Sequence, residues 1–182
     1  MIAPFVAVHP GRPCCLERVE SPIGELLLTG SDDALTGLYM LAAAGGRPPR
    51  TPPGARRVPG AFTRVAAQLR AYFAGERHEF DVPLSPGGSP FQLAVWSALT
   101  RIPYGTTTSY GAIARQLGKS PAASRAVGAA NGQNPIAVII PCHRVIGADG
   151  GLTGYGGGLE RKGLLLRLEG AAAVSPQHAT LW

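Results

Sequence analysis

Residues 109–132 read SYGAIARQLGKSPAASRAVGAANG, and this stretch decides how the second half of the chain folds. Two apolar stripes at helical spacing lie on either side of Gly118, which is a suitable helix stop. Thr107, Thr108 or Ser109 can cap the first helix, and Pro121 suits the first turn of the second. Two short helices across a turn of about four residues predict a helix-turn-helix, with a plain helical hairpin as the alternative. The stripes consist of Tyr110, Ile113, Ala114 and Leu117, and of Ala123, Ala126, Val127 and Ala130.

The outer face of the second helix carries small residues around one arginine. Arg125 lies opposite the apolar stripe and shares its side with Gly128, Ala129 and Gly132. Each glycine on an exposed helix face costs about 1 kcal/mol relative to alanine, so their presence favours close approach of a partner to the backbone. One arginine on a smooth surface can enter a narrow groove. The alternative is a helix packed on another helix, with Arg125 in solvent.

Positive charge is concentrated in the second half of the 182-residue chain. The formal net charge is +6, and residues 101–182 carry eight basic and three acidic side chains, against nine and eight in residues 1–100. This asymmetry favours a polyanionic partner, nucleic acid before membrane. A content of 45% hydrophobic and 15% charged residues excludes a disordered chain.

The three cysteines, Cys14, Cys15 and Cys142, exclude a disulfide framework. No apolar run of about 18 residues is present, so we expect no membrane span. No signal peptide is visible at the N-terminus. The sequence therefore predicts a cytoplasmic protein in which a free thiol can stay reactive.

The first half predicts a small sheet with one helix. Short strands are expected at 14–20, 24–30 and 34–41, with turn residues between them, and a helix at 61–73. Residues 42–60 are expected to form an irregular surface loop, and residues 81–90 an inter-domain linker. The predicted fold class is α+β: an N-terminal antiparallel sheet with a helix in domain 1–84, followed by a mainly helical C-terminal domain 85–182 containing the helix-turn-helix.

The segment 134–146, NPIAVIIPCHRVI, carries the chemistry. The apolar run 136–140 suits a buried strand or extended segment, which would hold the Cys142 thiol at the end of a rigid element. His143 can take a proton from this thiol, directly or through water, and Arg144 adds positive potential. Both neighbours favour the nucleophilic thiolate. The alternative is a cysteine that serves only as a small core residue.

Glu169 ends a leucine-rich stretch, 159–169, that we expect to be helical. By angle it falls on the apolar side, where a carboxylate needs a partner. His143 can supply that partner, which suggests a relay from glutamate through histidine to Cys142. The alternative is an ordinary helix-end glutamate exposed to water.

These motifs together resemble the O6-alkylguanine-DNA alkyltransferases, also called methylated-DNA–protein-cysteine methyltransferases, in a form similar to the bacterial members. The resemblance is strong over residues 88–170 and looser over residues 16–84. The matching segments, in order, are Phe91-Gln92 with Val95-Trp96, Ile102-Pro103-Tyr104-Gly105, Ser109-Tyr110, Arg125-Ala126-Val127-Gly128, Asn134-Pro135, Ile140-Pro141-Cys142-His143-Arg144-Val145 and Leu152-Thr153-Gly154-Tyr155-Gly156-Gly157-Gly158.

The resemblance implies DNA repair by direct, irreversible transfer of the alkyl group from O6-alkylguanine to the protein's own cysteine, with O4-alkylthymine left open as a second substrate. Cys142 would be the acceptor and His143 its base through a bridging water. Glu169 would orient His143, and Asn134 would sit in the hinge that joins the DNA-reading helix to the reactive segment. Each molecule would act once.

The resemblance also implies how the nucleotide is reached. It would be flipped out through the minor groove, with Arg125 filling its place in the duplex and Tyr110 pressing on the neighbouring phosphate. The DNA-binding residues would be Arg125, Tyr110, Ser109, Ala126 and Gly128. The base pocket would be formed by Tyr155, Val145, Gly156 and Gly157.

We therefore expect double-stranded DNA containing O6-alkylguanine as the partner, and neither a cofactor nor a resident metal. We expect a monomer in solution and leave cooperative assembly on DNA open. A structural zinc is the alternative for the N-terminal part, although its candidate ligands show no clear ligand spacing. Those candidates are His9, Cys14, Cys15 and His78. For the function, the alternative is a helix-turn-helix binding module in which Cys142 is only structural.

Overall fold

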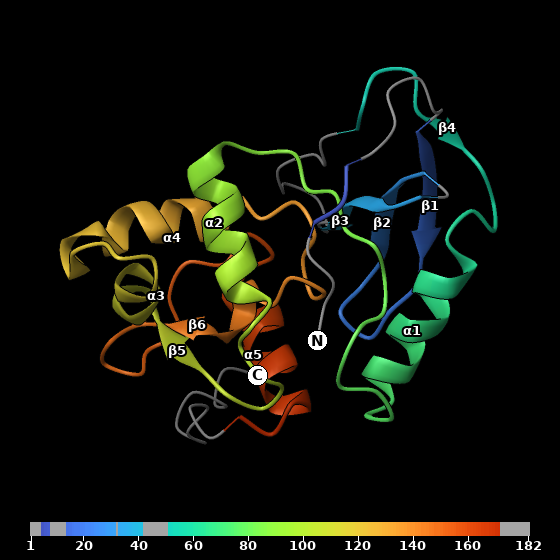
Figure 1. The fold of residues 1–182 in the computed structure, drawn as a ribbon. Helices are drawn as coiled ribbons and strands as arrows, with labels where there is room; N and C mark the ends of the chain where they lie inside the picture. The colour runs from blue at the N-terminus through green and yellow to red at the C-terminus, as the bar shows by residue number, and fades with distance from the viewer. Residues whose placement is uncertain (1–4, 8–13, 32, 42–50, 172–182) are drawn as a thin grey trace.

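The computed structural model describes residues 5–7, 14–31, 33–41 and 51–171. A small sheet with one helix forms the N-terminal part, and the remaining helices gather beside it (Figure 1). This architecture confirms the predicted α+β class. Within the described ranges, none of the helices combines the length and apolar character needed to cross a bilayer.

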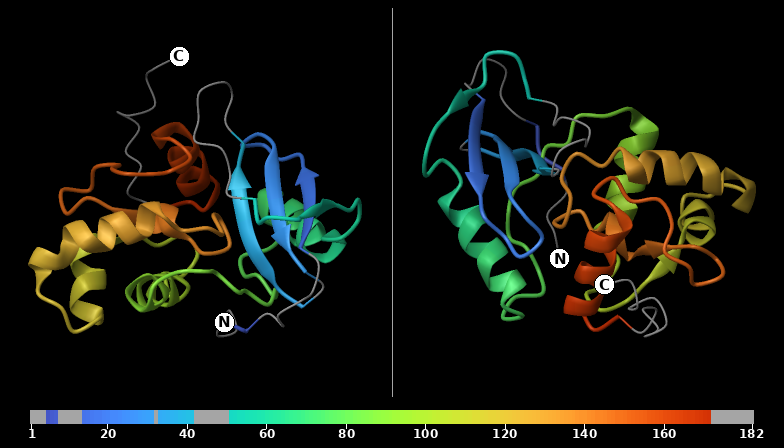
Figure 2. Two further views of the ribbon diagram at one scale, coloured as in Figure 1. Left: turned by 90° about the horizontal axis from the view of Figure 1, so that it is seen from above. Right: turned by 180° about the vertical axis from the view of Figure 1, so that it is seen from behind.

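The sheet has the order β3-β2-β1-β4. Strands β1 (Cys15–Val19), β2 (Leu26–Gly30) and β3 (Leu35–Met40) form the expected antiparallel meander. Helix α1 (Thr63–Phe73) lies against this sheet, and its residues Leu69 and Tyr72 are buried in the shared core (Figure 2). Part of the expected irregular loop is instead a fourth strand, β4 (Arg56–Arg57), which pairs in parallel with β1. Residues 42–50 of that loop lie outside the described residues.

The free edge of β3 is covered by two segments from outside the meander. Leu35 donates its backbone N–H to Pro83 at 2.9 Å and accepts from Ser85 at 2.8 Å. Leu38 is bonded in the same way to Pro135 and Ala137, at 2.8 and 3.0 Å. Pairing the edge removes exposed strand polar groups. Part of the segment 81–90, where an inter-domain linker is expected, therefore pairs with β3 through Pro83 and Ser85. The linker itself and the boundary between residues 84 and 85 stay predictions.

The second half begins with two capped helices. Helix α2 (Pro90–Leu99) starts with a capping box in which Ser89 and Gln92 satisfy each other's backbone N–H groups. Helix α3 (Tyr110–Gln116) is capped by Ser109, whose Oγ accepts from the Ala112 N–H at 3.2 Å. Ser109 is also the last residue of strand β5 (Thr108–Ser109), which pairs with β6 (Val145–Ile146).

Helix α4 (Ser124–Gly132) follows α3 after the one-turn 3-10 helix η1 (Pro121–Ala123). Gly118 ends α3 with a positive φ of 68°, as its position in the sequence predicts. The buried residues of α4 are Val127, Ala130 and Asn131, whereas Ala126 is exposed. Placing Ala126 on the apolar stripe was therefore wrong, because Asn131 takes part of the buried face. Helix α5 (Leu159–Leu168) completes the fold.

The apolar run 136–140 is not a strand. After a single β-bridge at Ile136 the chain turns, and Val138 has a φ of 68°, in the left-handed region. Burial on all sides explains the run of aliphatic residues, because Ile136, Val138, Ile139 and Ile140 are each at most 1% exposed. This compact turn leads directly into η2 (Cys142–Arg144), a 3-10 helix that carries the reactive segment.

Candidate active site

Cys142 is the first residue of η2, and its thiol opens on a cavity of about 800 Å3 between the N-terminal sheet and the helices of the second half. The residue is only 5% exposed. The cavity wall near it includes Asn131, Asn134, Tyr155, Gly156 and Gly157. A buried thiol that faces a cavity of this size can be reached by a ligand of the size of a nucleobase.

Two asparagines hold Cys142 in place. The Nδ2 group of Asn134 lies 3.0 Å from the Cys142 Sγ and donates to the Ile140 carbonyl at 2.8 Å. Asn131 donates its Nδ2 to the Cys142 carbonyl at 3.3 Å. Asn134 lies between α4 and η2, and its amide also contacts the Cys142 Sγ, which the predicted hinge role did not include.

Burial raises the pKa of the Cys142 thiol above its ordinary value. The hydrogen bond from Asn134, the positive charge of Lys162 and nearby backbone N–H groups act in the opposite direction without cancelling the effect of burial. The thiol is therefore protonated at rest and needs a base to become a nucleophile.

His143 has the geometry expected of such a base. Its Nε2 lies 2.9 Å from Oε1 of Glu169, and both side chains are fully buried. Since Glu169 is an anion, Nε2 carries the proton and donates it to this contact, which leaves the lone pair on Nδ1. Among the described residues this Nδ1 has no hydrogen-bond partner. Burial lowers the pKa of His143, so the imidazole is neutral and able to accept a proton.

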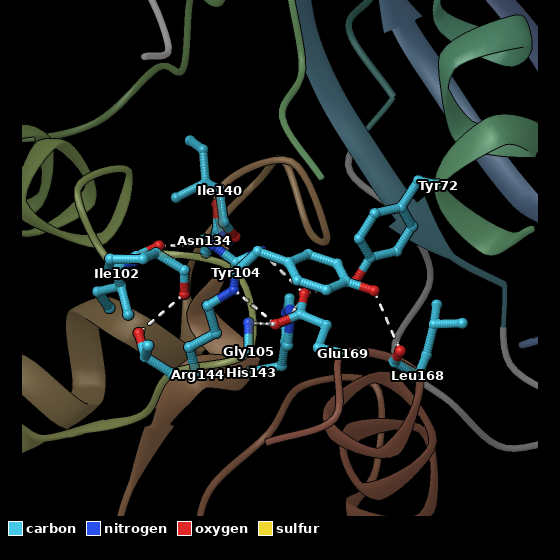
Figure 3. A network of polar contacts seen from close by, with 12 residues as sticks. Tyr72, Ile102, Tyr104, Gly105, Asn134, Ile140, His143, Arg144, Leu168 and Glu169 are labelled. Carbon is cyan, nitrogen blue, oxygen red and sulfur yellow. Dashed lines mark hydrogen bonds and ion pairs between the residues drawn. The ribbon is translucent and has the colours of Figure 1, made fainter. Parts of the chain in front are cut away.

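Glu169 is clamped by four residues (Figure 3). Arg144 binds both carboxylate oxygens, with Nε and Nη2 each at 2.8 Å. Tyr72 donates to Oε1 at 2.7 Å, and the Gly105 N–H donates to Oε2 at 3.3 Å. Burial alone would raise the pKa of Glu169, but the hydrogen bonds and charges of His143 and Arg144 hold it well below its usual range.

Arg144 does not act on the thiol as the sequence suggested. Its guanidinium is buried against Glu169 and donates Nη1 to the Ile102 carbonyl at 2.6 Å. The cation that acts on the thiol is instead Lys162, on α5. Its Nζ donates to the carbonyls of Val145 at 2.6 Å and Thr153 at 2.7 Å, and burial lowers its pKa to about 8.

The expected base-pocket residues are only partly together. Tyr155, Gly156 and Gly157 line the cavity, and the buried Tyr155 hydroxyl has no hydrogen-bond partner within the described part of the chain. A Cβ on Gly157 would lie 2.4 Å from the Met40 Sδ and 2.9 Å from Cε1 of Tyr155, so a side chain at this position would require these neighbours to shift. Val145 is not part of the cavity wall, and Lys162 binds its carbonyl.

The expected DNA-binding residues lie at α3 and α4. Arg125 and Ala126 are exposed, and Gly128 is half-buried, where an added Cβ would lie 3.7 Å from the Tyr110 ring. The Tyr110 hydroxyl donates to the Thr153 carbonyl at 3.1 Å and so connects α3 to the turn that carries Tyr155. The side chain of Ser109 serves as the cap of α3. The DNA contacts of these residues stay a prediction.

No group of three or more potential metal ligands is found among the described residues. Cys14 and Cys15 are free thiols at and beside the start of β1. His9, one of the candidate zinc ligands, lies outside the described residues.

Comparison with protein families gives two matches that together cover most of the chain. Residues 17–86 match the 6-O-methylguanine DNA methyltransferase, ribonuclease-like domain, and residues 90–171 match the DNA-binding domain of the same proteins. The chain belongs to the 6-O-methylguanine DNA methyltransferase family.

Relatives of this family are similar over nearly their whole length. A methylated-DNA–protein-cysteine methyltransferase of Mycolicibacterium paratuberculosis is 58% identical over 164 residues, which is 90% of this chain and 96% of the relative. A relative of the same name from Methanosarcina acetivorans is 51% identical over 152 residues, 84% of this chain and 96% of its own. The enzyme class predicted from the sequence is thereby confirmed.

Solved structures of methyltransferases from this family share the fold. The crystal structure of Mycobacterium tuberculosis OGT in complex with DNA superposes with a TM-score of 0.79 at 52% identity, covering 87% of this chain and 96% of that one.

Sequence reasoning missed three residues of this methyltransferase site. Lys162 has a detectable signal, because it shares the buried side of a helix with Leu165 and Leu166. Asn131 has a weaker signal, as a polar residue one position after the stripe residue Ala130. The contact of Tyr72 has no signal in the spacing, since this residue lies 97 residues from Glu169 in an ordinary amphipathic helix.

Proposed function

We propose that this methyltransferase repairs DNA by moving an alkyl group from O6 of guanine to the Sγ of Cys142, once per molecule. The observation that carries the proposal is the arrangement at η2. A buried thiol, bonded by Asn134 and open to a cavity, directly precedes a histidine whose proton-accepting nitrogen is fixed by Glu169.

The relay activates the thiol in two steps. The proton of Cys142 passes to Nδ1 of His143 through a bridging water, because this nitrogen has no hydrogen-bond partner among the residues that the structure describes. The resulting imidazolium is stabilised by Glu169, which is held as an anion by Arg144. The thiolate is stabilised by the Asn134 amide and by the charge of Lys162.

Transfer follows as a displacement at the alkyl carbon. The thiolate forms an S–C bond while the C–O6 bond breaks, and the electron pair of that bond stays with guanine. The proton that left Cys142 balances the charge of the released guanine. The thioether product has no easy reversal, so the protein is consumed as a stoichiometric acceptor.

Access to the base requires that the nucleotide leave the duplex. A base inside the stack cannot be attacked in line by a buried thiol, and flipping costs a few kcal/mol, least for a damaged base. Helix α4 suits minor-groove entry, because exposed Arg125 projects beside the small residues Ala126, Ala129 and Gly132. Minor-groove readout is degenerate, which suits repair in any sequence.

Double-stranded DNA containing O6-alkylguanine is the partner that this chemistry requires, and the relay needs no cofactor. The DNA complex of the M. tuberculosis relative supports the same partner. Action as a monomer is part of the proposal.

The test is a mass measurement on the intact protein. After incubation with a duplex containing O6-methylguanine, we expect a gain of about 14 Da, one methylene, that is absent from Cys142→Ser. The same measurement with a duplex containing O4-methylthymine tests the second substrate. An unchanged mass with intact DNA binding would leave only the alternative, a helix-turn-helix binding module with a structural cysteine.

A further inference from the structure

One buried hydroxyl of the N-terminal part of the molecule contacts a residue of the candidate active site. Tyr72 lies on α1, is 0% exposed and donates its hydroxyl to Oε1 of Glu169 at 2.7 Å. The other donors to this carboxylate all come from the second half of the chain. No step of the mechanism proposed above uses Tyr72.

Tyr72 contacts the same carboxylate oxygen of Glu169 that accepts from His143. Oε1 of Glu169 accepts from His143 Nε2 at 2.9 Å and from Tyr72 at 2.7 Å, and also from Nη2 of Arg144 at 2.8 Å. Each hydrogen bond donated to a carboxylate oxygen spreads its negative charge and weakens its attraction for the next proton. The Tyr72 hydroxyl and the His143 imidazole therefore compete for the same charge.

We propose that Tyr72 is a positioning residue of the relay, through which the N-terminal part keeps His143 neutral and ready to accept the thiol proton. The inference rests on the proposed function, in which His143 is the base. Without the hydroxyl, Oε1 would attract a proton on His143 more strongly, and a larger fraction of the imidazole would be protonated before the thiol could use it.

The hydroxyl is suited to this task because it keeps its proton throughout the pH range in which His143 titrates. Burial and the charge of Glu169 raise the pKa of Tyr72 far above its ordinary value. Its ring is fixed by aromatic contacts with Phe73, Phe80 and Tyr104, at centroid distances of 5.3, 5.3 and 6.1 Å. The hydroxyl therefore has one orientation, toward Glu169.

The other titratable and charged groups around the relay come from two elements and two loops. Arg144 is on η2, Tyr104 follows α2, and Lys162 is on α5. Cys142 precedes His143, and Tyr155 is on the cavity wall. Arg144 and Lys162 both lower the pKa of His143, after burial, while Glu169 raises it. Tyr72 is the member of this set that the N-terminal part contributes.

The test compares two tyrosine-to-phenylalanine variants. Tyr72→Phe removes the donor to Glu169 and keeps the packed ring. Tyr104→Phe is the matched control, because its hydroxyl donates to the Leu168 carbonyl at 3.0 Å and not to Glu169. The His143 pKa is measured by NMR of the ring nitrogens without DNA, and the acid limb of the methyl-transfer rate is measured with duplex substrate.

We expect Tyr72→Phe to raise the pKa of His143 by about half a pH unit. The acid limb of the methyl-transfer rate should move to higher pH by the same amount. Tyr104→Phe should move neither. If Tyr72→Phe does not fold, 3-fluorotyrosine incorporated at position 72 is a stronger donor and should shift the titration downward.

A titration that is unchanged by either substitution at position 72, or that Tyr104→Phe displaces equally, would overturn the inference and leave Tyr72 with a packing role. The titration is measured without substrate, so it is independent of alkyl transfer. Failure of the wild-type protein to accept a methyl group would instead overturn the proposed function.

Discussion

Lys162 is an unusual group for a protein interior, a buried cation bonded only to two backbone carbonyls in the described structure. Its charge favours the Cys142 thiolate. We therefore expect Lys162→Met, which keeps much of the apolar stem, to slow thiol alkylation roughly tenfold at pH 7, where the lysine is charged, and to slow it less above pH 8, where the lysine loses its proton. The rate of iodoacetamide labelling as a function of pH measures both effects.

The control for this change is Arg167→Met, which removes an exposed cation from the same helix. It should leave the labelling profile in place. A Lys162→Met profile that coincides with that of the control would show that the thiol does not sense the lysine, and that Lys162 only supports the carbonyls of Val145 and Thr153.

At the scale of single residues, the sequence predicts contacts that repeat a local pattern. The angle of Glu169 on its helix, together with its need for a buried partner, predicted the contact with His143 that the structure contains. Arg144 was placed wrongly because neighbours in sequence do not share a direction in a 3-10 helix. Its side chain leaves the thiol and binds Glu169.

At the scale of elements, α4 presents one strong candidate for entry into DNA. Arg125→Ala should slow repair of duplex DNA far more than reaction with the free base O6-benzylguanine, because only the duplex has a stack to open. The comparison of the two rate constants is the measurement. Arg101→Ala removes another exposed charge outside α3 and α4 and should affect both substrates little. Equal losses on both substrates for Arg125→Ala would contradict entry into the duplex.

Helices and strands with clear periodicity were predictable, and the segment 136–140 was not. A short run of aliphatic residues fits a buried strand and a buried turn equally well, since both hide every side chain. The left-handed φ of Val138 is unfavourable for a β-branched residue, so no propensity argument would place a turn there. The backbone hydrogen bonds to Leu38 on β3 determine this turn instead.

At the scale of the whole molecule, the active site is assembled from both halves of the chain. The turn that leads to Cys142 is bonded to the edge of β3, and Tyr72 reaches Glu169 from α1. Arg161 on α5 donates to the Leu41 carbonyl at 2.9 Å. None of these contacts follows a periodic signal, because the partners are about 100 residues apart and each lies in an element with an ordinary local pattern. The division into two domains therefore does not separate scaffold from chemistry.

This assembly makes stability depend on pH through His143. Its pKa is lowered in the folded protein and near 6.5 in the unfolded chain, so below pH 6.5 the unfolded state binds the proton first. The free energy of unfolding should therefore fall on acidification, by at most about 1.4 kcal/mol per pH unit, until the folded imidazole also protonates. Glu169, whose pKa is also lowered, adds a second loss of stability only below about pH 4.3.

Denaturant unfolding of His143→Gln between pH 5 and 8 isolates the effect of His143. The variant should lose most of the slope between pH 6.5 and 5 and run parallel to the wild type above pH 7. An unchanged slope in the variant would mean that His143 binds a proton equally well in the folded and unfolded chains, and would contradict the neutral, buried base on which the relay depends.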